Sequence, residues 1–178
     1  LNLETLQKYN LDEEKKQKLI RTTLDETSRL DFLTNNILVA AQLESNNFKA
    51  EKEELDLTAL LKDCIRQFSN RFPERNFVED IEGDTDIKGD PLLLQMLINN
   101  LLENATKYSP KESPISTILK KNRSGIELLI KDKGIGIDEM EKPKIFTKFY
   151  RIGSEATRKT KGTGLGLYLC RKIAKDHN

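Results

Sequence analysis

Apolar and polar residues recur with two different periods along this chain, and the change of period falls near residue 47. From about residue 12 to residue 43, apolar and small residues are spaced alternately three and four positions apart, which predicts one long helix. Asp12 is placed to cap the start of this helix, ahead of the acidic Glu13 and Glu14. The regularly spaced residues are Ile20, Thr23, Thr27, Leu30, Thr34, Ile37 and Ala41.

Three further leucines, Leu24, Leu33 and Leu38, make the apolar stripe of this helix wider than the seam of a two-stranded coiled coil. Two helices alone cannot bury so wide a stripe, whereas a four-helix bundle formed by two chains can. Residues 1–8 are expected to form the end of a preceding helix. We therefore expect residues 1–47 to form part of a dimerisation module, and we expect the protein to be a homodimer. The alternative is that the long helix packs on the downstream part of its own chain.

Beyond a polar linker, the pattern changes to short apolar runs that mix strands with helices. Thr58 is expected to cap one helix, and Asp90 and Pro91 to start another. Because these elements do not repeat as strand–helix–strand units, the expected fold class for residues 48–178 is α+β, with a mixed or antiparallel sheet and helices over one face. The expected strands are residues 55–57, 76–81, 86–88, 115–121 and 125–131.

The composition narrows the classes of partner and compartment. The 178 residues carry a formal net charge of +1, so no overall field favours binding to nucleic acid or to an anionic membrane. No apolar run reaches the roughly 20 residues that span a bilayer. Cys64 and Cys170 fall in helical patterns and are expected to be reduced core residues of a cytoplasmic protein, with a disulfide between them as the alternative.

One helix face carries residues whose chemistry needs an explanation. At about 100° per residue, Asn100, Asn104 and Lys107 project from one side of the helix that begins at Pro91. Asparagine has a low helix propensity, so its presence inside a helix often indicates a functional role. Carboxamide oxygens suit a hard cation such as Mg²⁺, which also keeps phosphate oxygens in its shell. Taken alone, the stretch is also compatible with a polar helix face that has no role.

Two glycine motifs follow this helix. The first, Asp-Lys-Gly-Ile-Gly-Ile at residues 132–137, comes directly after an apolar strand, so its backbone can approach a flat ligand while the carboxylate accepts a hydrogen bond from an exocyclic amine. The second, at residues 162–167, opens the last helix, where free backbone amides form an anion site that suits phosphates. It is neither a Walker loop nor a Rossmann fingerprint. Alone, the first motif is also a common turn.

The segment between the glycine motifs is long, with only a short helical patch expected, which is typical of a lid. Four apolar and aromatic residues, Ile145, Phe146, Phe149 and Tyr150, would anchor it to the body. Its cations either face a triphosphate or form an ordinary solvated charge run, and Arg151 is the one that we favour as a phosphate contact. The cations are Lys142, Lys144, Lys148, Arg151, Arg158, Lys159 and Lys161.

In this order, the motifs Asn-x-x-x-Asn-Ala-x-Lys-Tyr-Ser, Asp-x-Gly-x-Gly, Ile-Phe-x-x-Phe-Tyr-Arg and Gly-Thr-Gly-Leu-Gly-Leu resemble the N, G1, F and G2 boxes of the sensor histidine kinases of two-component systems. The resemblance covers roughly residues 55–178, and residues 11–43 resemble the second helix of that family's dimerisation domain. It implies a Bergerat-type (GHKL) α/β sandwich with a mixed sheet that binds ATP and Mg²⁺. The implied activity is transfer of the γ-phosphate to a histidine, for relay to an aspartate of a response regulator.

By motif position, the resemblance implies that Asn104 is the Mg²⁺ ligand and that Asn100 supports the metal and the phosphates. Lys107 and Tyr108 would contact the phosphates or the closed lid, with Lys107 and the two asparagines as the catalytic residues. Asp132 would bind the adenine amino group. The remaining residues would shape the pocket, hinge the lid or bind phosphate: Gly134, Gly136, Ile137, Arg151, Gly162, Thr163, Gly164, Leu165 and Gly166.

Some features depart from the family's pattern. The family's acceptor histidine lies in a helix expected upstream of Leu1, and its last strands would follow Asn178, so we expect a fragment whose acceptor histidine, and any sensor anchored in the inner membrane, lie outside it. His177, the single histidine, is expected to have a structural role. Lys148 stands where the family often has arginine, which leaves its role open.

Other classes of protein share the fold that the resemblance implies. ATP-hydrolysing relatives of the gyrase, mismatch-repair or heat-shock chaperone type place a water-activating glutamate four residues before the metal-binding asparagine, where this chain has Asn100. Glu103 lies about 100° around the helix from Asn104 and cannot activate the same water. Two alternatives stay open: a serine kinase of the GHKL fold, and a dimeric nucleotide-binding scaffold without phosphotransfer.

Overall fold

The computed structural model describes residues 6, 9, 11–45, 49–83, 85–123, 125–153 and 162–177. By its internal contacts the chain divides into two units, Leu1–Gln42 and Leu43–Asn178. Most of the expected helix end at residues 1–8 lies outside the described residues. The assignment of domains to residues 1–47 and 48–178 stays a prediction.

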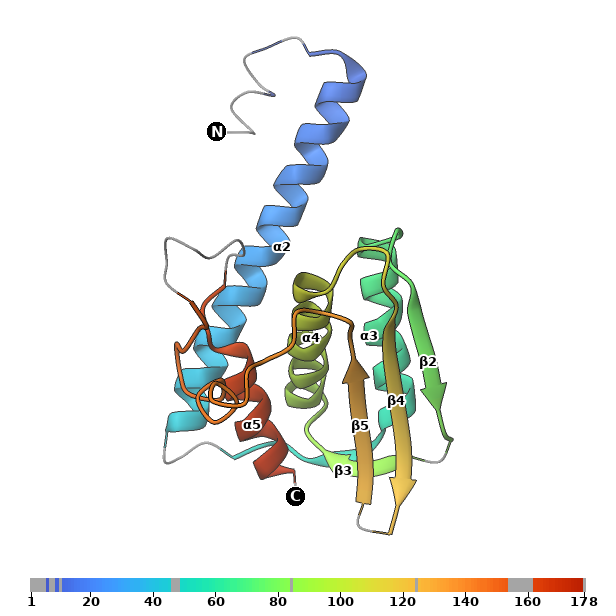
Figure 1. Cartoon of the computed structure of the whole chain (residues 1–178), viewed down its shortest axis with the longest axis vertical. Helices are drawn as coiled ribbons and strands as arrows, with labels where there is room; N and C mark the ends of the chain where they lie inside the picture. Colours follow the sequence, from blue (N-terminus) through green and yellow to red (C-terminus); the bar gives the residue numbers. More distant parts are fainter. Residues whose placement is uncertain are drawn as a thin grey trace. The chain divides into compact units, whose positions relative to one another are not determined.

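The smaller unit consists mainly of helix α2, Glu13–Glu44, which is drawn in blue in Figure 1 and whose last two residues, Leu43 and Glu44, belong to the larger unit. Asp12 caps it as expected, because its carboxylate accepts a hydrogen bond from the Lys15 amide at 2.8 Å. The Lys15 ammonium and amide together lower the pKa of Asp12. Apolar side chains of the expected stripe are exposed along the helix, and Leu24 and Leu30 each have 62% of their surface accessible.

The larger unit contains two sheets. Strands β1 (Glu53–Asp56) and β3 (Asp86–Gly89) form an antiparallel pair. The second sheet has the order β2-β4-β5, with β2 parallel to β4 and β4 antiparallel to β5, so it is mixed as predicted. Its strands are β2 (Phe77–Ile81), β4 (Ile115–Asn122) and β5 (Gly125–Lys131).

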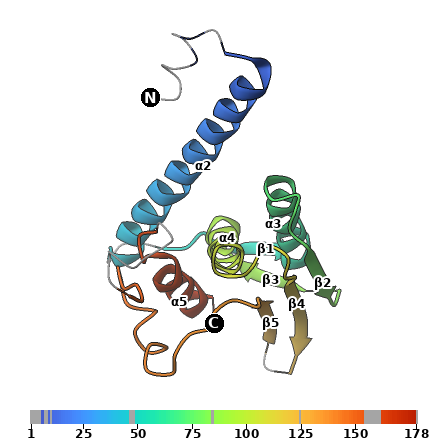
Figure 2. The same cartoon turned by 45° about the horizontal axis from the view of Figure 1, so that its top comes forward.

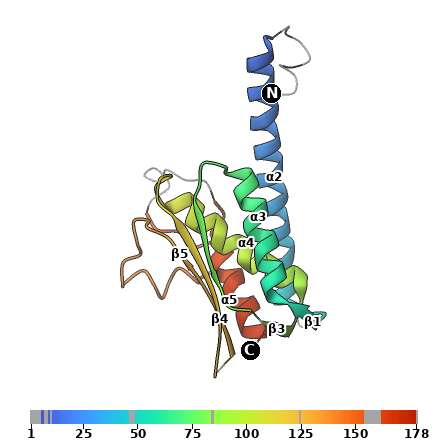
Figure 3. The ribbon, with the colours of Figure 1, turned by 90° about the vertical axis from the view of Figure 1, so that its right-hand side faces the viewer.

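Three helices accompany the sheets: α3 (Leu57–Arg71), α4 (Pro91–Tyr108) and α5 (Gly166–Asp176). Helices α3 and α4 lie over one face of the three-stranded sheet and α5 lies beside α4, as Figure 2 shows. Figure 3 presents the sheet close to edge-on, with the helices on one side of it. This two-layer arrangement matches the expected α+β class.

The core is formed where α3 and α4 meet β4. Its fully buried members include Leu61 and Cys64 of α3, Ile98 and Leu102 of α4, and Leu119 of β4. These positions recur every three or four residues on the helices, so each helix turns one apolar side toward the sheet. The opposite side of α4 is thereby left for the polar residues discussed below.

Helix α4 starts as predicted. The Asp90 carboxylate accepts hydrogen bonds from the amides of Leu92 and Leu93, each at 3.1 Å, and Pro91 occupies the first turn. Helix α3 corrects a prediction, because it begins one residue before Thr58 and its cap is Asp56. The Thr58 hydroxyl instead lies 2.6 Å from the hydroxyl of Thr85.

His177 has the structural role that was expected. Its Nδ1 lies 2.8 Å from the Ile173 carbonyl, to which it donates, and its Nε2 accepts a hydrogen bond from the Asp90 amide at 2.9 Å. These two contacts fix one neutral tautomer and join the end of α5 to the start of α4. Gly89 lies close beside it, since a Cβ there would lie 2.6 Å from the end of the Leu94 side chain and 3.0 Å from the histidine ring.

Both cysteines are free and buried, as expected. Burial raises the pKa of the Cys64 thiol to about 11 and that of Cys170 to about 12. We therefore expect neither thiol to react with a disulfide reagent at pH 8 in the folded chain, and both to react after unfolding. Because the unfolded thiols lose their protons first, these groups should also lower stability as the pH rises above about 9. Rapid labelling of either thiol in the folded chain would contradict this.

Candidate functional site

Contacts around three glycines bring the predicted motifs together. An ideal Cβ on Gly166 would lie 2.6 Å from Asn100 Oδ1, and one on Gly162 would lie 2.8 Å from Lys107 Nζ. A Cβ on Gly134 would lie 2.7 Å from the Tyr108 carbonyl oxygen. The polar face of α4 is therefore in close contact with residues 162–166, and the C-terminal end of the helix is in close contact with the turn that follows β5.

Asn100 lies at the centre of α4 and is only 3% exposed. Its Nδ2 donates to the Met96 carbonyl at 2.9 Å, and its Oδ1 faces Gly166, the first residue of α5. Asn104, one turn later, is half-buried. Asn100 is thus packed against the glycine-rich segment, and Asn104 keeps an accessible part.

Lys107 and Tyr108 form the last turn of α4. The Lys107 ammonium lies 5.1 Å from the centroid of the Tyr108 ring, in the range of a cation–π interaction. It also lies close to Gly162, where any side chain larger than hydrogen would meet it. A cation therefore stands beside the glycine-rich segment that the sequence predicted to bind phosphate.

Asp132 is exposed and directly follows β5. Its Oδ1 accepts a hydrogen bond from the Gly134 amide at 2.7 Å, which closes a tight turn. Gly136 has φ of 72°, a left-handed conformation that favours glycine. The second oxygen of Asp132 has no part in that bond, and Ile137 is 41% exposed beside the turn.

The aromatic residues of the segment between the two glycine motifs pack on the second motif. The Phe149 amide donates to the Gly164 carbonyl at 3.1 Å, and a Cβ on Gly164 would lie 2.7 Å from backbone atoms of Phe149 and Tyr150. Both Phe149 and Gly164 have positive φ, 64° and 75°. Phe149 is the one non-glycine residue with positive φ in the described part of the chain. The pairing therefore holds one strained residue, Phe149, against a glycine in a conformation that glycine adopts readily.

Thr163 and Leu165 support the start of α5 in different ways. The Thr163 hydroxyl accepts a hydrogen bond from the Leu165 amide at 3.4 Å, just before α5 begins. The Leu165 side chain is only 1% exposed, so it belongs to the core and leaves its backbone for any contact with a ligand. Arg151 is half-buried directly after the aromatic segment.

The expected short helical patch in the lid is wrong for residues 138–153. These residues form consecutive turns, because Pro143 lacks an amide proton and the hydrogen bonds alternate between three- and four-residue spans. The Tyr150 hydroxyl donates to Glu141, which lowers the pKa of Glu141 and raises that of Tyr150. Residues 154–161, with Arg158, Lys159 and Lys161, lie outside the described residues.

Lys148, whose role the sequence left open, has a carboxylate partner within the larger unit. Its ammonium lies 2.8 Å from both oxygens of Glu44, and the Tyr168 hydroxyl donates to the same carboxylate at 2.9 Å. These bonds lower the pKa of Glu44, and burial, with a smaller effect of the hydrogen bond to Glu44, raises the pKa of Tyr168. Nothing in the sequence pattern connects Glu44 with two partners so far along the chain.

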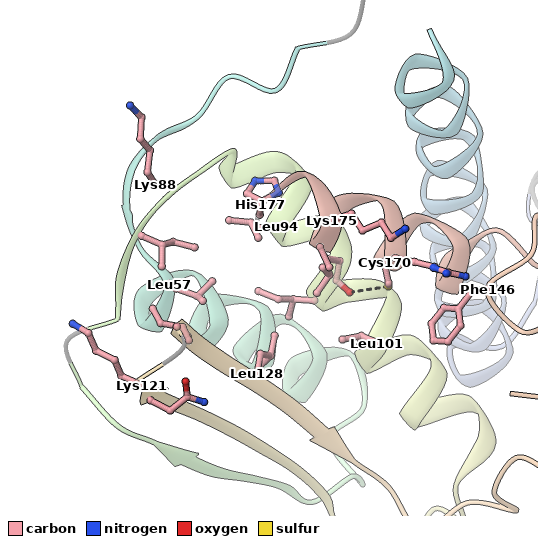
Figure 4. A pocket seen from close by; sticks show the side chains of 18 of the residues that line it. Leu57, Lys88, Leu94, Leu101, Lys121, Leu128, Phe146, Cys170, Lys175 and His177 are labelled. Atoms are coloured by element: carbon pink, nitrogen blue, oxygen red, sulfur yellow. Dashed lines mark hydrogen bonds between the residues drawn. The ribbon is translucent and has the colours of Figure 1, made fainter. Parts of the chain in front are cut away.

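A large cavity of about 1370 Å³ lies elsewhere in the larger unit. Its apolar walls come from α4, α5 and β5, and Figure 4 shows Cys170 there with its thiol bonded to the Leu97 carbonyl. Lysines and one arginine, Lys88, Lys121, Lys142, Arg171 and Lys175, stand around it. Its lining contains none of the asparagines of α4 and no part of the turn after β5, so it is separate from the candidate site.

No cluster of three or more histidine, cysteine, aspartate or glutamate side chains within the described ranges could hold a metal ion. Helices long and apolar enough to cross a membrane are likewise absent from those ranges. At the candidate site, the half-buried Asn104 offers a carboxamide oxygen, which is a ligand type that Mg²⁺ accepts.

Comparisons with known proteins bear on these features. The family described as "Histidine kinase-, DNA gyrase B-, and HSP90-like ATPase" matches residues 89–178. Among curated proteins, the sensor protein kinase WalK of Staphylococcus aureus is 31% identical over 170 residues, which cover 94% of this chain and 41% of that protein. The chain therefore spans less than half the length of this curated relative.

Solved structures agree in fold. The mycobacterial sensor histidine kinase MprB is 27% identical with a TM-score of 0.62, covering 71% of this chain and 80% of that chain. The catalytic domain of histidine kinase ThkA is 26% identical with a TM-score of 0.63, over 71% of this chain and 82% of that chain. Full-length ShkA, solved with AMPPNP, is 21% identical with a TM-score of 0.70, covering 99% of this chain and 37% of that chain, and this likeness is one of fold alone. The expected resemblance and fold class are confirmed.

Proposed function

Because the chain belongs to the family of histidine kinase-, DNA gyrase B- and HSP90-like ATPases, we propose that residues 48–178 are the ATP-binding catalytic region of a two-component sensor histidine kinase. In this proposal, the region transfers the γ-phosphate of ATP to a histidine. The phosphoryl group then passes to an aspartate of a response regulator. The likeness to the sensor kinase WalK along 94% of the chain supports this assignment.

The convergence of four separate segments is the observation that carries the proposal. Residues 100–108, 132–137, 149–151 and 162–166 are far apart in the sequence, yet each is in close contact with another through a glycine. Glycine backbone, which carries no side chain, can approach a flat ring closely and can present its amides to phosphate oxygens. Accessible carboxylate, amide and ammonium groups supply the polar contacts of a nucleotide site.

The individual roles follow from this chemistry. Asp132 accepts a hydrogen bond from the adenine amino group, and Lys107 and Arg151 contact the phosphates. Gly134, Gly136 and Ile137 shape the adenine end, while Gly162, Thr163, Gly164, Leu165 and Gly166 offer backbone to the phosphates. Mg²⁺ would be held by the Asn104 carboxamide oxygen together with phosphate oxygens, and it would neutralise charge on the transferring group.

The position of Glu103 favours phosphoryl transfer over hydrolysis. Its carboxylate lies 3.4 Å from the Arg71 guanidinium of α3, on the side of α4 that faces that helix. It is thus engaged away from Asn104, and the position four residues earlier is Asn100, which cannot accept a proton from water. The nucleophile that receives the phosphoryl group must then be supplied by a protein side chain.

The exposed stripe of α2 supports a homodimer in this proposal. Leu24, Leu30, Ile37 and Leu38 are each more than half exposed on a single helix. Burying such a stripe against a second copy would remove apolar surface from water at roughly 25 cal/mol per Å². A four-helix bundle of two chains is the simplest closed arrangement that does so.

Nucleotide titration with and without Mg²⁺ tests the proposed metal ligand. Asn104→Ala is expected to abolish the gain in ATP affinity that Mg²⁺ gives and to lower phosphoryl transfer at least about 100-fold, because it removes the carboxamide oxygen proposed to bind the ion. The matched control is Asn122→Ala, on an exposed strand end. A variant at position 104 with an unchanged Mg²⁺ dependence would remove this residue from the metal site.

The chemical stability of the phosphorylated product tests the reaction class. With radioactive ATP and a histidine-bearing helix of the expected upstream type added as acceptor, the product should be labile in acid and stable in base. That behaviour is expected of phosphohistidine. An acid-stable product would favour the serine-kinase alternative, and no product with intact ATP binding would favour the non-catalytic scaffold.

A further inference from the structure

One arginine outside the predicted motifs binds the end of the helix that carries them. Arg75 lies in the turn between α3 and β2, and its guanidinium donates to the carbonyls of Thr106, Ser109 and Pro110. The distance to Ser109 O is 3.0 Å and that to Pro110 O is 2.5 Å. A fourth hydrogen bond reaches the Ser109 hydroxyl at 3.2 Å. One side chain therefore satisfies several carbonyls at the α4 C-terminus.

The backbone around Arg75 is itself fixed. Its amide donates to the Phe72 carbonyl at 2.9 Å, and the carbonyl of the next residue, Asn76, accepts from the Ile115 amide at 2.9 Å. A positive group at a helix C-terminus is also favoured by the helix dipole. The guanidinium is thus presented from an ordered turn to the helix end, where carbonyls lack partners within the helix.

The carbonyls that Arg75 binds flank the one that contacts the adenine-end turn. Tyr108 O lies between Thr106 O and Ser109 O in the chain, and it is the atom that a Cβ on Gly134 would approach to 2.7 Å. Gly134 in turn donates its amide to Asp132. A shift of the helix end would therefore move the surface against which the Asp132 turn packs.

We propose that Arg75 is a positioning residue of the nucleotide site, which sets the placement of Lys107 and Tyr108 relative to the Asp132–Gly134 turn without touching the ligand. This inference rests on the proposed function for its consequence, but not for its geometry. A planar fork is needed, because lysine cannot donate to so many acceptors at fixed angles.

Amide NMR spectra of the 178-residue chain without nucleotide test the geometry. In Arg75→Ala, the resonances of Tyr108 and Gly134 are expected to move, and in Arg75→Lys they should move less. Arg66→Ala is the control, because Arg66 is exposed and pairs only with Asp63 in the same helix among its described contacts. If Arg75→Ala does not fold, the lysine variant and Arg75→Gln carry the test. An unmoved Gly134 resonance in the folded variants overturns the inference.

Binding of Mg²⁺–ATP tests the consequence. Well below the unfolding midpoint, Arg75→Ala is expected to bind about tenfold more weakly than the parent chain, with Arg75→Lys recovering part of the loss. A purely structural role would lower the midpoint and leave the affinity of the folded chain unchanged, which would overturn the inference. A parent chain that binds no ATP, with the Gly134 shift still present, would contradict the proposed function and leave the positioning role supported.

Discussion

Replacing Asp132 by asparagine is expected to lower the affinity for ATP about 100-fold while the chain stays folded. Asparagine keeps one side-chain oxygen, which can still accept the Gly134 amide at the position of Oδ1. It replaces the other oxygen by an NH₂ group, which would face the adenine amino group donor to donor. The turn should therefore survive, and only recognition of the base should be lost.

Asp138, which lies in the next turn of the chain, offers a matched control for this substitution. The Asp138 carboxylate accepts a hydrogen bond from the Met140 amide at 2.8 Å, in the same local pattern. Asp138→Asn should bind ATP like the parent chain, and both variants should unfold at the parent's denaturant concentration. Calorimetric titration measures the affinities. Unchanged affinity in Asp132→Asn would contradict the assignment of the adenine end.

Gly164→Ala is expected to lower the free energy of unfolding by about 2–4 kcal/mol and to weaken ATP binding as well. The left-handed backbone at φ of 75° is unfavourable for alanine. In addition, the new methyl group would lie 2.7 Å from backbone atoms of Phe149 and Tyr150, which cannot move aside as a flexible side chain could. The aromatic segment would then separate from residues 162–166.

Gly136→Ala separates the two causes. Gly136 has nearly the same φ, 72°, but a Cβ there would meet no atom within 4 Å. It should therefore lose only the conformational part, about 1–2 kcal/mol. Unfolding in guanidinium chloride gives both values. Equal losses in the two variants would show that the contact with the Phe149–Tyr150 backbone contributes nothing.

Features with a local cause were predictable from the sequence. Asp90 and Pro91 start α4 because an N-cap and a first-turn proline act on amides within three residues. The apolar face of α4 follows from the helical spacing of its leucines and isoleucine. The glycines of residues 162–166 predict the start of a helix and close packing around it.

Features whose partners are distant backbone atoms were not predictable. Arg75 binds carbonyls more than thirty residues away, and a carbonyl leaves no mark in the sequence because every residue has one. Thr58 looked like a cap, but its hydroxyl pairs with Thr85 across the unit, which leaves the capping to Asp56. The partnership of Lys148 with Glu44 is of the same long-range kind.

The strand order has a consequence for assembly. Parallel strands β2 and β4 require a connection that leaves the sheet and returns, and helix α4 lies within that connection. We therefore expect the helix to pack on the sheet when β2 and β4 pair in register. Because this pairing closes a long connection, it is a non-local and comparatively slow step of folding. The position of the polar face of α4 and the register of the sheet are then linked, so a slip of one strand would also misplace the asparagines.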